Sequence, residues 1–128
     1  MAAVRVKICG LTRIEDVREA IDSGADALGF IFGHHSSPRN LSFARLEELT
    51  KEVPPYVGVV VVSPALNPEL PKVIEDVRPS ILQISSYGDQ KLDQVYFQPN
   101  VVGTFHLGKG DGQDKESIIS KCKNLSKN

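Results

Sequence analysis

The sequence has few cysteines, almost no net charge and no long apolar run. Cys9 and Cys122 are the two cysteines of the 128 residues, and their separation fits no metal-ligand spacing. Lys plus Arg total 15 and Asp plus Glu total 16, so the net charge of −1 gives no electrostatic case for nucleic acid or an anionic membrane. No segment reaches the roughly 18–20 apolar residues of a membrane span, and the N-terminal residues turn polar too early for a signal peptide. These absences predict a cytoplasmic protein that binds no nucleic acid, no membrane and no metal.

The composition that remains is that of an ordinary globular protein. Apolar residues make up 41% of the chain and charged residues 24%, which argues against wholesale disorder. A length of 128 residues corresponds to one domain. We therefore expect a single domain over residues 1–128.

Strand patterns and helix patterns alternate along the chain. Val4, Val6 and Ile8 alternate with polar residues, as in a strand, and four later segments are short and mostly apolar. Nearly continuous apolar strands are typical of parallel sheets that are covered on both faces. The expected strands are 4–8, 27–32, 57–62, 80–84 and 101–107.

Capping residues place the helices between these strands. Thr12 lies three residues before Glu15, which predicts a capping box at the first helix. Ser42 is suited to cap the second helix, and Asn67 to cap the third with Pro68 at its first position. A short helix at 91–96 and a last helix at 117–125 follow, with loops at 33–40 and 108–114.

Five strand–helix units with short connections predict a parallel sheet with right-handed crossovers. Two architectures fit. A flavodoxin-like, doubly wound open sheet is complete with five units. A (β/α)8 barrel needs eight units and about 200 residues or more, so this chain amounts to part of one.

The first unit carries the clearest chemistry. Cys9 lies at the carboxyl end of the first strand, where barrel enzymes place reactive groups. Lys7 shares the strand face of Cys9, and a nearby cation and the next helix N-terminus both favour a thiolate. Cys9 is therefore a candidate base, with Lys7 as electrostatic support. The alternative is an unreactive cysteine that only packs.

The amino-acid sequences of several segments resemble those of one enzyme family. VRVKICGLT at 4–12, SGADALGFIF at 23–32, SSPRNLS at 36–42 and PPYVGVVVV at 54–62 occur in order. Together they closely resemble phosphoribosylanthranilate isomerase, a (β/α)8 TIM-barrel enzyme of tryptophan biosynthesis. The resemblance covers roughly residues 4–89 and implies an N-terminal portion that lacks the last three strand–helix units.

The resemblance implies an Amadori rearrangement of N-(5-phosphoribosyl)anthranilate to 1-(2-carboxyphenylamino)-1-deoxyribulose 5-phosphate. The family's base is the cysteine of the KICG motif, which corresponds to Cys9. The arginine of the SPR segment contacts the anthranilate carboxylate, which corresponds to Arg39, and a guanidinium fork suits a carboxylate. The alternative for Arg39 is a solvated loop charge. No metal or organic cofactor is implied, and the expected partner is a phosphorylated sugar–anthranilate substrate.

The chain departs from the family pattern in several places. The family's QLHG segment after the fourth strand reads QISSYGD at 83–89, without the histidine that helps to hold the anthranilate end. The family's general acid follows a sixth strand, and its phosphate turns follow the seventh and eighth. Asp89 and His106 are local candidates for an acid. Asp111 and Asp114 lie in a glycine-rich loop and are weaker candidates.

The expected fold is a partial (β/α)8 barrel of about five units, with a parallel open sheet. An unclosed sheet exposes edge strands that invite pairing, so we expect self-association through those edges. Three functional hypotheses stay open. The first is the isomerase, with a chain that is truncated and inactive alone. The second is a non-catalytic, barrel-derived module that associates with other chains. The third is an unrelated flavodoxin-like binding domain.

Overall fold

The computed structural model describes residues 3–85, 100–103 and 119–120. These residues form a parallel sheet with the order β1-β2-β4-β5-β6, and the short β3 also pairs with β2. The strands are β1 (Lys7–Cys9), β2 (Ala27–Phe32), β3 (Asn40–Leu41), β4 (Gly58–Ser63), β5 (Ile81–Ile84) and β6 (Asn100–Gly103). The helices are α1 (Ile14–Asp22), α2 (Phe43–Thr50) and α3 (Leu70–Val77).

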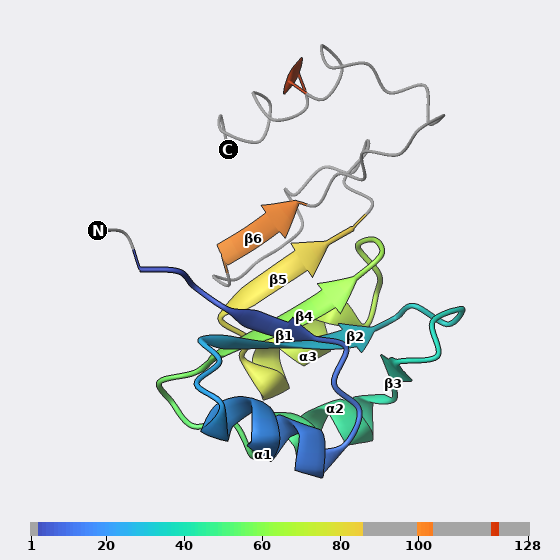
Figure 1. Ribbon diagram of the computed structural model, residues 1–128. Helices are drawn as coiled ribbons and strands as arrows, with labels where there is room; N and C mark the ends of the chain where they lie inside the picture. The colour runs from blue at the N-terminus through green and yellow to red at the C-terminus, as the bar shows by residue number, and fades with distance from the viewer. Residues whose placement is uncertain (1–2, 86–99, 104–118, 121–128) are drawn as a thin grey trace.

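The strand order decides between the two expected architectures. β2, β4, β5 and β6 follow β1 in order across the sheet, with β3 beside β2 off this path, and α1, α2 and α3 all lie on one side of the sheet (Figure 1). A doubly wound sheet would reverse direction at a switch point and carry helices on both faces. The partial-barrel prediction is confirmed for the described strands, and the flavodoxin-like alternative is wrong for them.

The core lies between the sheet and these helices. Leu28 and Phe30 of β2 are fully buried, as are Val61 of β4 and Leu82 of β5. The helices meet them with Val17, Leu46, Leu49, Leu70 and Val73, each at most 2% exposed. Fully burying a side chain of this size contributes roughly 1.5–3 kcal/mol. One face of the sheet is therefore committed to packing, which leaves the other face for a site.

The first helix begins one residue later than its capping box predicts. Arg13 is the N-cap residue and makes no side-chain capping bond. Its carbonyl accepts the N–H of Val17 at 3.1 Å, whereas the Thr12 carbonyl accepts two N–H groups from Arg45. Glu15 is then the second helical residue, too early to reach back to an N-cap. The capping-box prediction is wrong because a tertiary contact occupies the Thr12 carbonyl.

Of the other two helices, α2 begins where the sequence predicts and α3 begins later. Ser42 caps α2, since its Oγ accepts the N–H of Arg45 at 3.2 Å. Asn67 accepts the N–H of Glu69 at 3.0 Å, but α3 itself begins at Leu70 with Glu69 as N-cap. The predicted cap residue thus forms the turn before the helix, and the predicted start is two residues early.

Several expected elements lie outside the described residues. These are the helix at 91–96, the loop at 108–114 and most of the strand at 101–107 and of the helix at 117–125, of which Ile119 and Ser120 are helical. None of the helices in the described part of the chain has the length and apolarity needed to span a bilayer.

Candidate functional site

Cys9 ends β1 on the face of the sheet that turns away from the helices. In the register, Cys9 aligns with Gly29 of β2 and Val60 of β4, whereas the buried Leu28 and Phe30 alternate with Gly29 on the opposite face. Cys9 is exposed, so it is not packed in the core. The thiol is open to a ligand on the barrel-facing side of the sheet.

Gly29 makes room for the Cys9 side chain. A Cβ atom at Gly29 would lie 2.6 Å from Cys9 Sγ and 3.1 Å from Cys9 Cα, far inside van der Waals contact. Gly29 also holds the chain just after the cysteine, because its carbonyl accepts the N–H of Gly10 at 2.9 Å and that of Leu11 at 3.2 Å. The glycine therefore fixes both the space for Cys9 and the turn that follows it.

The Arg39 side chain lies directly over this turn. Gly10 has a φ of 82°, and a Cβ built on it would lie 2.7 Å from Arg39 Cδ and 3.5 Å from Arg39 Nε. Arg39 comes from the 33–40 segment after β2, where its N–H donates to Ser37 Oγ at 3.2 Å. Arg39 is thus placed against the residue that follows Cys9. The two predicted site residues, far apart in sequence, lie near each other at the carboxyl end of the sheet.

Lys7 has a different partner from the one expected. It shares the face of Cys9, as predicted, but its ammonium donates to Gln83 Oε1 of β5. Three strand spacings of about 4.8 Å each separate β1 from β5 in the sheet order, so this contact requires the sheet to curl. The Lys7–Gln83 bond shows that the face carrying Cys9 is concave.

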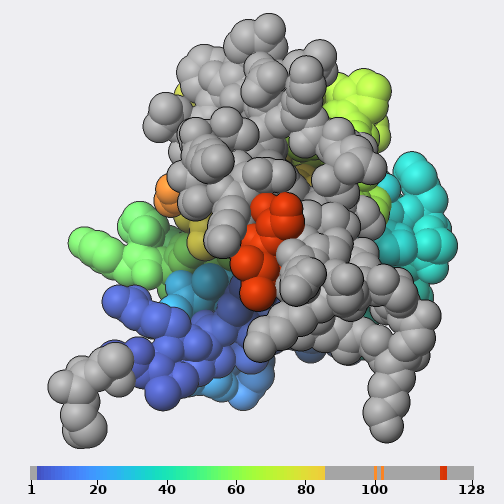
Figure 2. Space-filling model, turned by 90° about the horizontal axis from the view of Figure 1, so that it is seen from above, coloured from blue at the N-terminus to red at the C-terminus, as the bar shows by residue number. Residues whose placement is uncertain are grey.

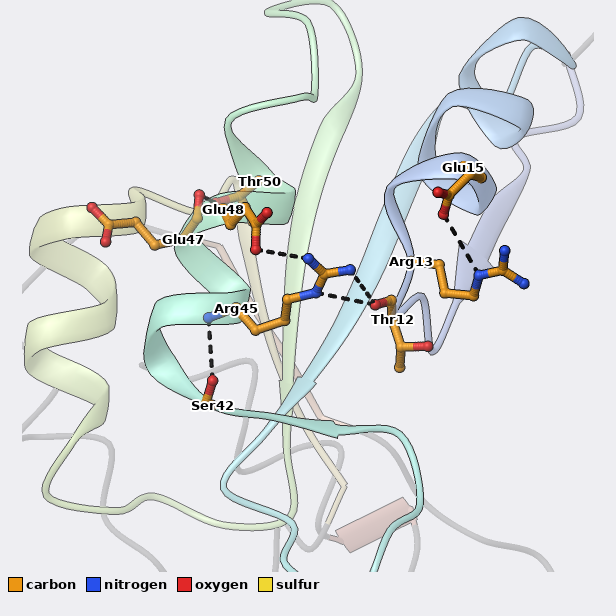
Figure 3. A network of polar contacts seen from close by, with 8 residues as sticks. All are labelled: Thr12, Arg13, Glu15, Ser42, Arg45, Glu47, Glu48 and Thr50. Carbon is orange, nitrogen blue, oxygen red and sulfur yellow. Dashed lines mark hydrogen bonds and ion pairs between the residues drawn. The ribbon is translucent and has the colours of Figure 1, made fainter.

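Sequence reasoning missed Arg45 as well as the role of Gly29. Arg45 extends from α2 to the β1–α1 loop, where Nε and Nη2 donate to the Thr12 carbonyl at 3.3 and 3.1 Å (Figure 3). A lone glycine inside an apolar strand is a known signal for a close approach and could have identified Gly29. No local signal distinguishes Arg45 from any other helical arginine.

The start of α1 near this loop carries a titration shift. The pKa of Glu15 lies below its usual value, first because the carboxylate accepts a backbone N–H at the helix start, and second because Arg13 is close. Arg13 Nε lies 3.6 Å from Glu15 Oε2. Carboxylates are favoured at a helix N-terminus, so the start of α1 stabilises the ionised form of Glu15.

Other polar groups near the strand ends have structural partners. The buried Ser63 hydroxyl donates to the Ala65 carbonyl at 2.8 Å and accepts from Asn67 Nδ2 at 3.2 Å. His34 Nδ1 lies 3.1 Å from Ser36 Oγ. Within residues 3–85, 100–103 and 119–120, no three His, Cys, Asp or Glu side chains converge as a metal site.

The candidate acids cannot be placed beside Cys9. Asp89, His106, Asp111 and Asp114 all lie outside the described residues, and so do residues 86–89 of the QISSYGD segment. Among the described residues, the candidate site therefore consists of Cys9 and Arg39, with Gly29, Gly10 and Arg45 around them.

Comparison with known proteins gives one consistent family. The chain is 46% identical over 90 residues to the N-(5'-phosphoribosyl)anthranilate isomerase of Thiobacillus denitrificans, covering 70% of this chain and 42% of that protein. A phosphoribosyl anthranilate isomerase structure from Thermus thermophilus matches with a TM-score of 0.67 and 29% identity, covering 81% of this chain and 52% of that one. A second isomerase structure, in complex with reduced 1-(o-carboxyphenylamino)-1-deoxyribulose 5-phosphate, matches with a TM-score of 0.58 and 27% identity over 98% of this chain and 50% of that one.

The chain spans about half the length of the relatives that it matches. The model of the N-(5'-phosphoribosyl)anthranilate (PRA) isomerase family matches residues 6–106. That span includes Cys9, Arg39, Gly29 and Arg45 together with every described strand. The chain therefore belongs to the N-(5'-phosphoribosyl)anthranilate isomerase family.

Proposed function

We propose that this chain carries the base and the carboxylate-binding part of a phosphoribosylanthranilate isomerase site. The observation that supports this most strongly is the exposed Cys9 thiol at the carboxyl end of β1 with the Arg39 side chain over the adjacent Gly10. A nucleophilic or basic group next to an anion-binding group is what an anthranilate-bearing sugar needs. The related structure was determined in complex with a carboxyphenylamino-deoxyribulose phosphate, a ligand that has both an aromatic carboxylate and a sugar.

The proposed reaction moves protons without any net change of redox state, because C1′ is reduced as C2′ is oxidised. An acid protonates the ring oxygen of the aminoaldose, the C1′–O bond breaks, and a Schiff base forms at C1′. Cys9, as thiolate, removes the C2′ proton, and the electron pair of the C2′–H bond moves toward the Schiff-base nitrogen to give an enolamine. Tautomerisation to the ketone completes the rearrangement, and a proton returns to the carbon skeleton at C1′. No metal or organic cofactor is needed for these steps.

Arg39 is assigned the anthranilate carboxylate. Its guanidinium can offer two parallel N–H donors to a carboxylate, which fixes both the position and the plane of the aromatic acid. The loop position of Arg39 and its packing on Gly10 support this role, since a purely solvated arginine would not need to lie against the turn after Cys9. Lys7, held on Gln83 across the concave face, contributes positive charge to the same surface.

The described residues supply one half of the acid–base pair. The isomerisation needs an acid and a phosphate cradle in addition to Cys9, and neither has been placed. We propose that self-association through the open edges of the sheet, in the cytoplasm, is how this chain would bring further groups to the concave face.

Turnover by the purified chain, followed as loss of substrate fluorescence, tests the proposal. In Cys9→Ala we expect kcat to fall by about a hundredfold or more while KM changes little, because the base acts on the transition state. Cys122→Ser is the matched control and should keep the starting activity. Absence of turnover in a folded, unsubstituted chain would contradict isomerase activity of this polypeptide, and turnover in Cys9→Ala would remove the base assignment.

A further inference from the structure

Arg45 is unusual among the described arginines because it bonds to a main-chain carbonyl in a different structural unit. It lies in the first turn of α2, and its guanidinium crosses to the loop between β1 and α1 (Figure 3). Two of its nitrogens donate to the Thr12 carbonyl, and Nη1 donates to Glu48 Oε2 at 2.7 Å. The Arg45 side chain is 36% exposed, so its contact is partly shielded from water.

The carbonyl that Arg45 binds belongs to the segment that follows Cys9. The first part of this segment is attached to β2, because the Gly10 and Leu11 N–H groups both donate to the Gly29 carbonyl. Leu11 itself is 7% exposed and belongs to the core. Beyond Leu11, Arg45 provides the next attachment, and α1 begins two residues after Thr12.

Two attachments, one on each side, therefore hold a turn that passes through a glycine with positive φ. Gly10 has a φ of 82° and carries the Arg39 side chain on its surface. If the Thr12 end were released, the segment could rotate about Gly10, and both the Arg39 side chain above it and Cys9 before it would lose their relative placement. A displacement of about 1 Å in such a constellation can lower a rate up to about a hundredfold.

We propose that Arg45 is a positioning residue of this site. By binding the Thr12 carbonyl it fixes the turn after Cys9 and so sets the distance between the Cys9 thiol and the Arg39 guanidinium. The expected effect of Arg45 on turnover rests on the proposed isomerase function, whereas its effect on the geometry of the turn does not. The proposal rests on the contact of Arg45 with the Thr12 carbonyl and not on a contact with the thiol or with Arg39.

Arg18 offers a matched control for loss of an inter-element arginine contact. Its Nε and Nη2 both donate to Glu52 Oε2, at 3.0 and 2.8 Å, and so connect α1 to the residues just after α2. As in the Arg45 contact, two guanidinium nitrogens donate to one oxygen. It lies at the end of α2 away from the Thr12 loop, so Arg18→Met should cost stability without changing the turn.

Hydrogen exchange of backbone amides tests the fixing of the turn directly. In Arg45→Met we expect the Gly10 and Leu11 amides to exchange about tenfold faster than in Arg18→Met, after both are referred to the α3 amides of the same protein. Arg45→Lys, which keeps one donor, should lie between. Equal exchange at Gly10 and Leu11 in the Met variants would overturn the proposal.

Two further measurements test the consequence for the site. In a Cys122→Ser background, the rate of Cys9 alkylation by iodoacetate relative to iodoacetamide reports whether a cation is held beside the thiol. We expect this ratio to fall severalfold in Arg45→Met and to stay unchanged in Arg18→Met. Where turnover is measurable, kcat should fall about tenfold in Arg45→Met with little change in KM.

The outcomes separate this proposal from the isomerase proposal. The chain could lack turnover and still show the exchange contrast and the altered alkylation ratio. In that case Arg45 remains the positioning residue, and the isomerase assignment is wrong for this chain. Loss of the exchange contrast, or an alkylation ratio that matches that of Arg18→Met, overturns the positioning role whatever the activity.

Discussion

Gly29 sets the space available to the reactive side chain. Gly29 is buried, and an added Cβ would meet both the Sγ and the main chain of Cys9, so the strands or the thiol would have to move. Overpacking of this kind costs about 1–3 kcal/mol of unfolding free energy. We therefore expect Gly29→Ala to be destabilised by that amount in urea unfolding and to alkylate at Cys9 with an altered rate.

Gly58→Ala is the control for this substitution. Gly58 lies in β4 on the same sheet face, and a Cβ there would meet the Ala27 Cβ at 3.3 Å, a milder clash that a small main-chain shift can relieve. It should lose clearly less stability and leave Cys9 alkylation unchanged. Equal destabilisation in the two variants would show that Gly29 has no special relation to the cysteine.

At this scale the sequence identified the candidate residues Cys9 and Arg39 and not the residues that we propose as their supports. Cys9 at the end of the first strand and Arg39 after the second were identifiable because strand ends and motifs are local features. Gly29 and Arg45 act across strands and between helices, so their roles depend on register and on helix placement. Those relations exist only once the chain has folded.

The start of α1 shows how a tertiary contact shifts an element boundary. Thr12 and Glu15 have the spacing of a capping box, yet the Thr12 carbonyl is bound by Arg45 and the helix begins at Ile14. The strand at 27–32 and the cap at Ser42 were predicted correctly, because their local patterns are sufficient to form them. Local patterns therefore located the elements, whereas the later start of α1 coincides with a long-range contact that no local pattern contains.

Glu15 gives α1 a pH-dependent contribution to stability. The folded-state pKa lies below the ordinary value of 4.5, so the contribution is fully present above that value and is lost as the pH falls through the lower folded pKa. We expect Glu15→Gln to have a lower Tm than the unsubstituted chain at about pH 7 and nearly the same Tm at about pH 3. The measurement is thermal unfolding across this range.

Glu19→Gln provides the comparison, because it removes the same charge from the middle of α1 instead of its first turn. Its effect on Tm should be smaller at neutral pH, since the helix dipole acts mainly on the terminal turns. A Tm difference for Glu15→Gln that persists unchanged into acid would rule out the carboxylate as its source.

The described part of the chain is a curled sheet covered on one face by helices. Figure 2 views it from the side away from the helices, where residues of the N-terminal strand, in blue, are visible. Periodicity predicted strands and helices, but it could not choose between an open doubly wound sheet and part of a barrel. The strand order and the Lys7–Gln83 contact across the concave face make that choice, and both are relations between distant segments.

β1 ends the described strand order, and the apolar residues in it and just before it are poorly covered. Val4, Val6 and Ile8 are 85%, 44% and 40% exposed, although Ile8 aligns with the fully buried Leu28 of β2. An uncovered edge strand with apolar side chains is a template for pairing with another chain, and lysine on such an edge blocks it. We expect the chain to self-associate, and we expect Val6→Lys combined with Ile8→Lys to shift it toward monomer in sedimentation velocity over a concentration series.

Tyr56→Lys separates edge pairing from general surface hydrophobicity. Tyr56 is 97% exposed in the loop between α2 and β4 and is not part of the edge strand, so its replacement should leave the sedimentation behaviour unchanged. A chain that sediments as a monomer at every concentration, or a Tyr56→Lys effect as large as that of the edge variant, would contradict pairing through β1. If pairing through β1 does occur, the contact forms at the strand that ends in Cys9, so the partner's residues would approach the concave face beside the thiol.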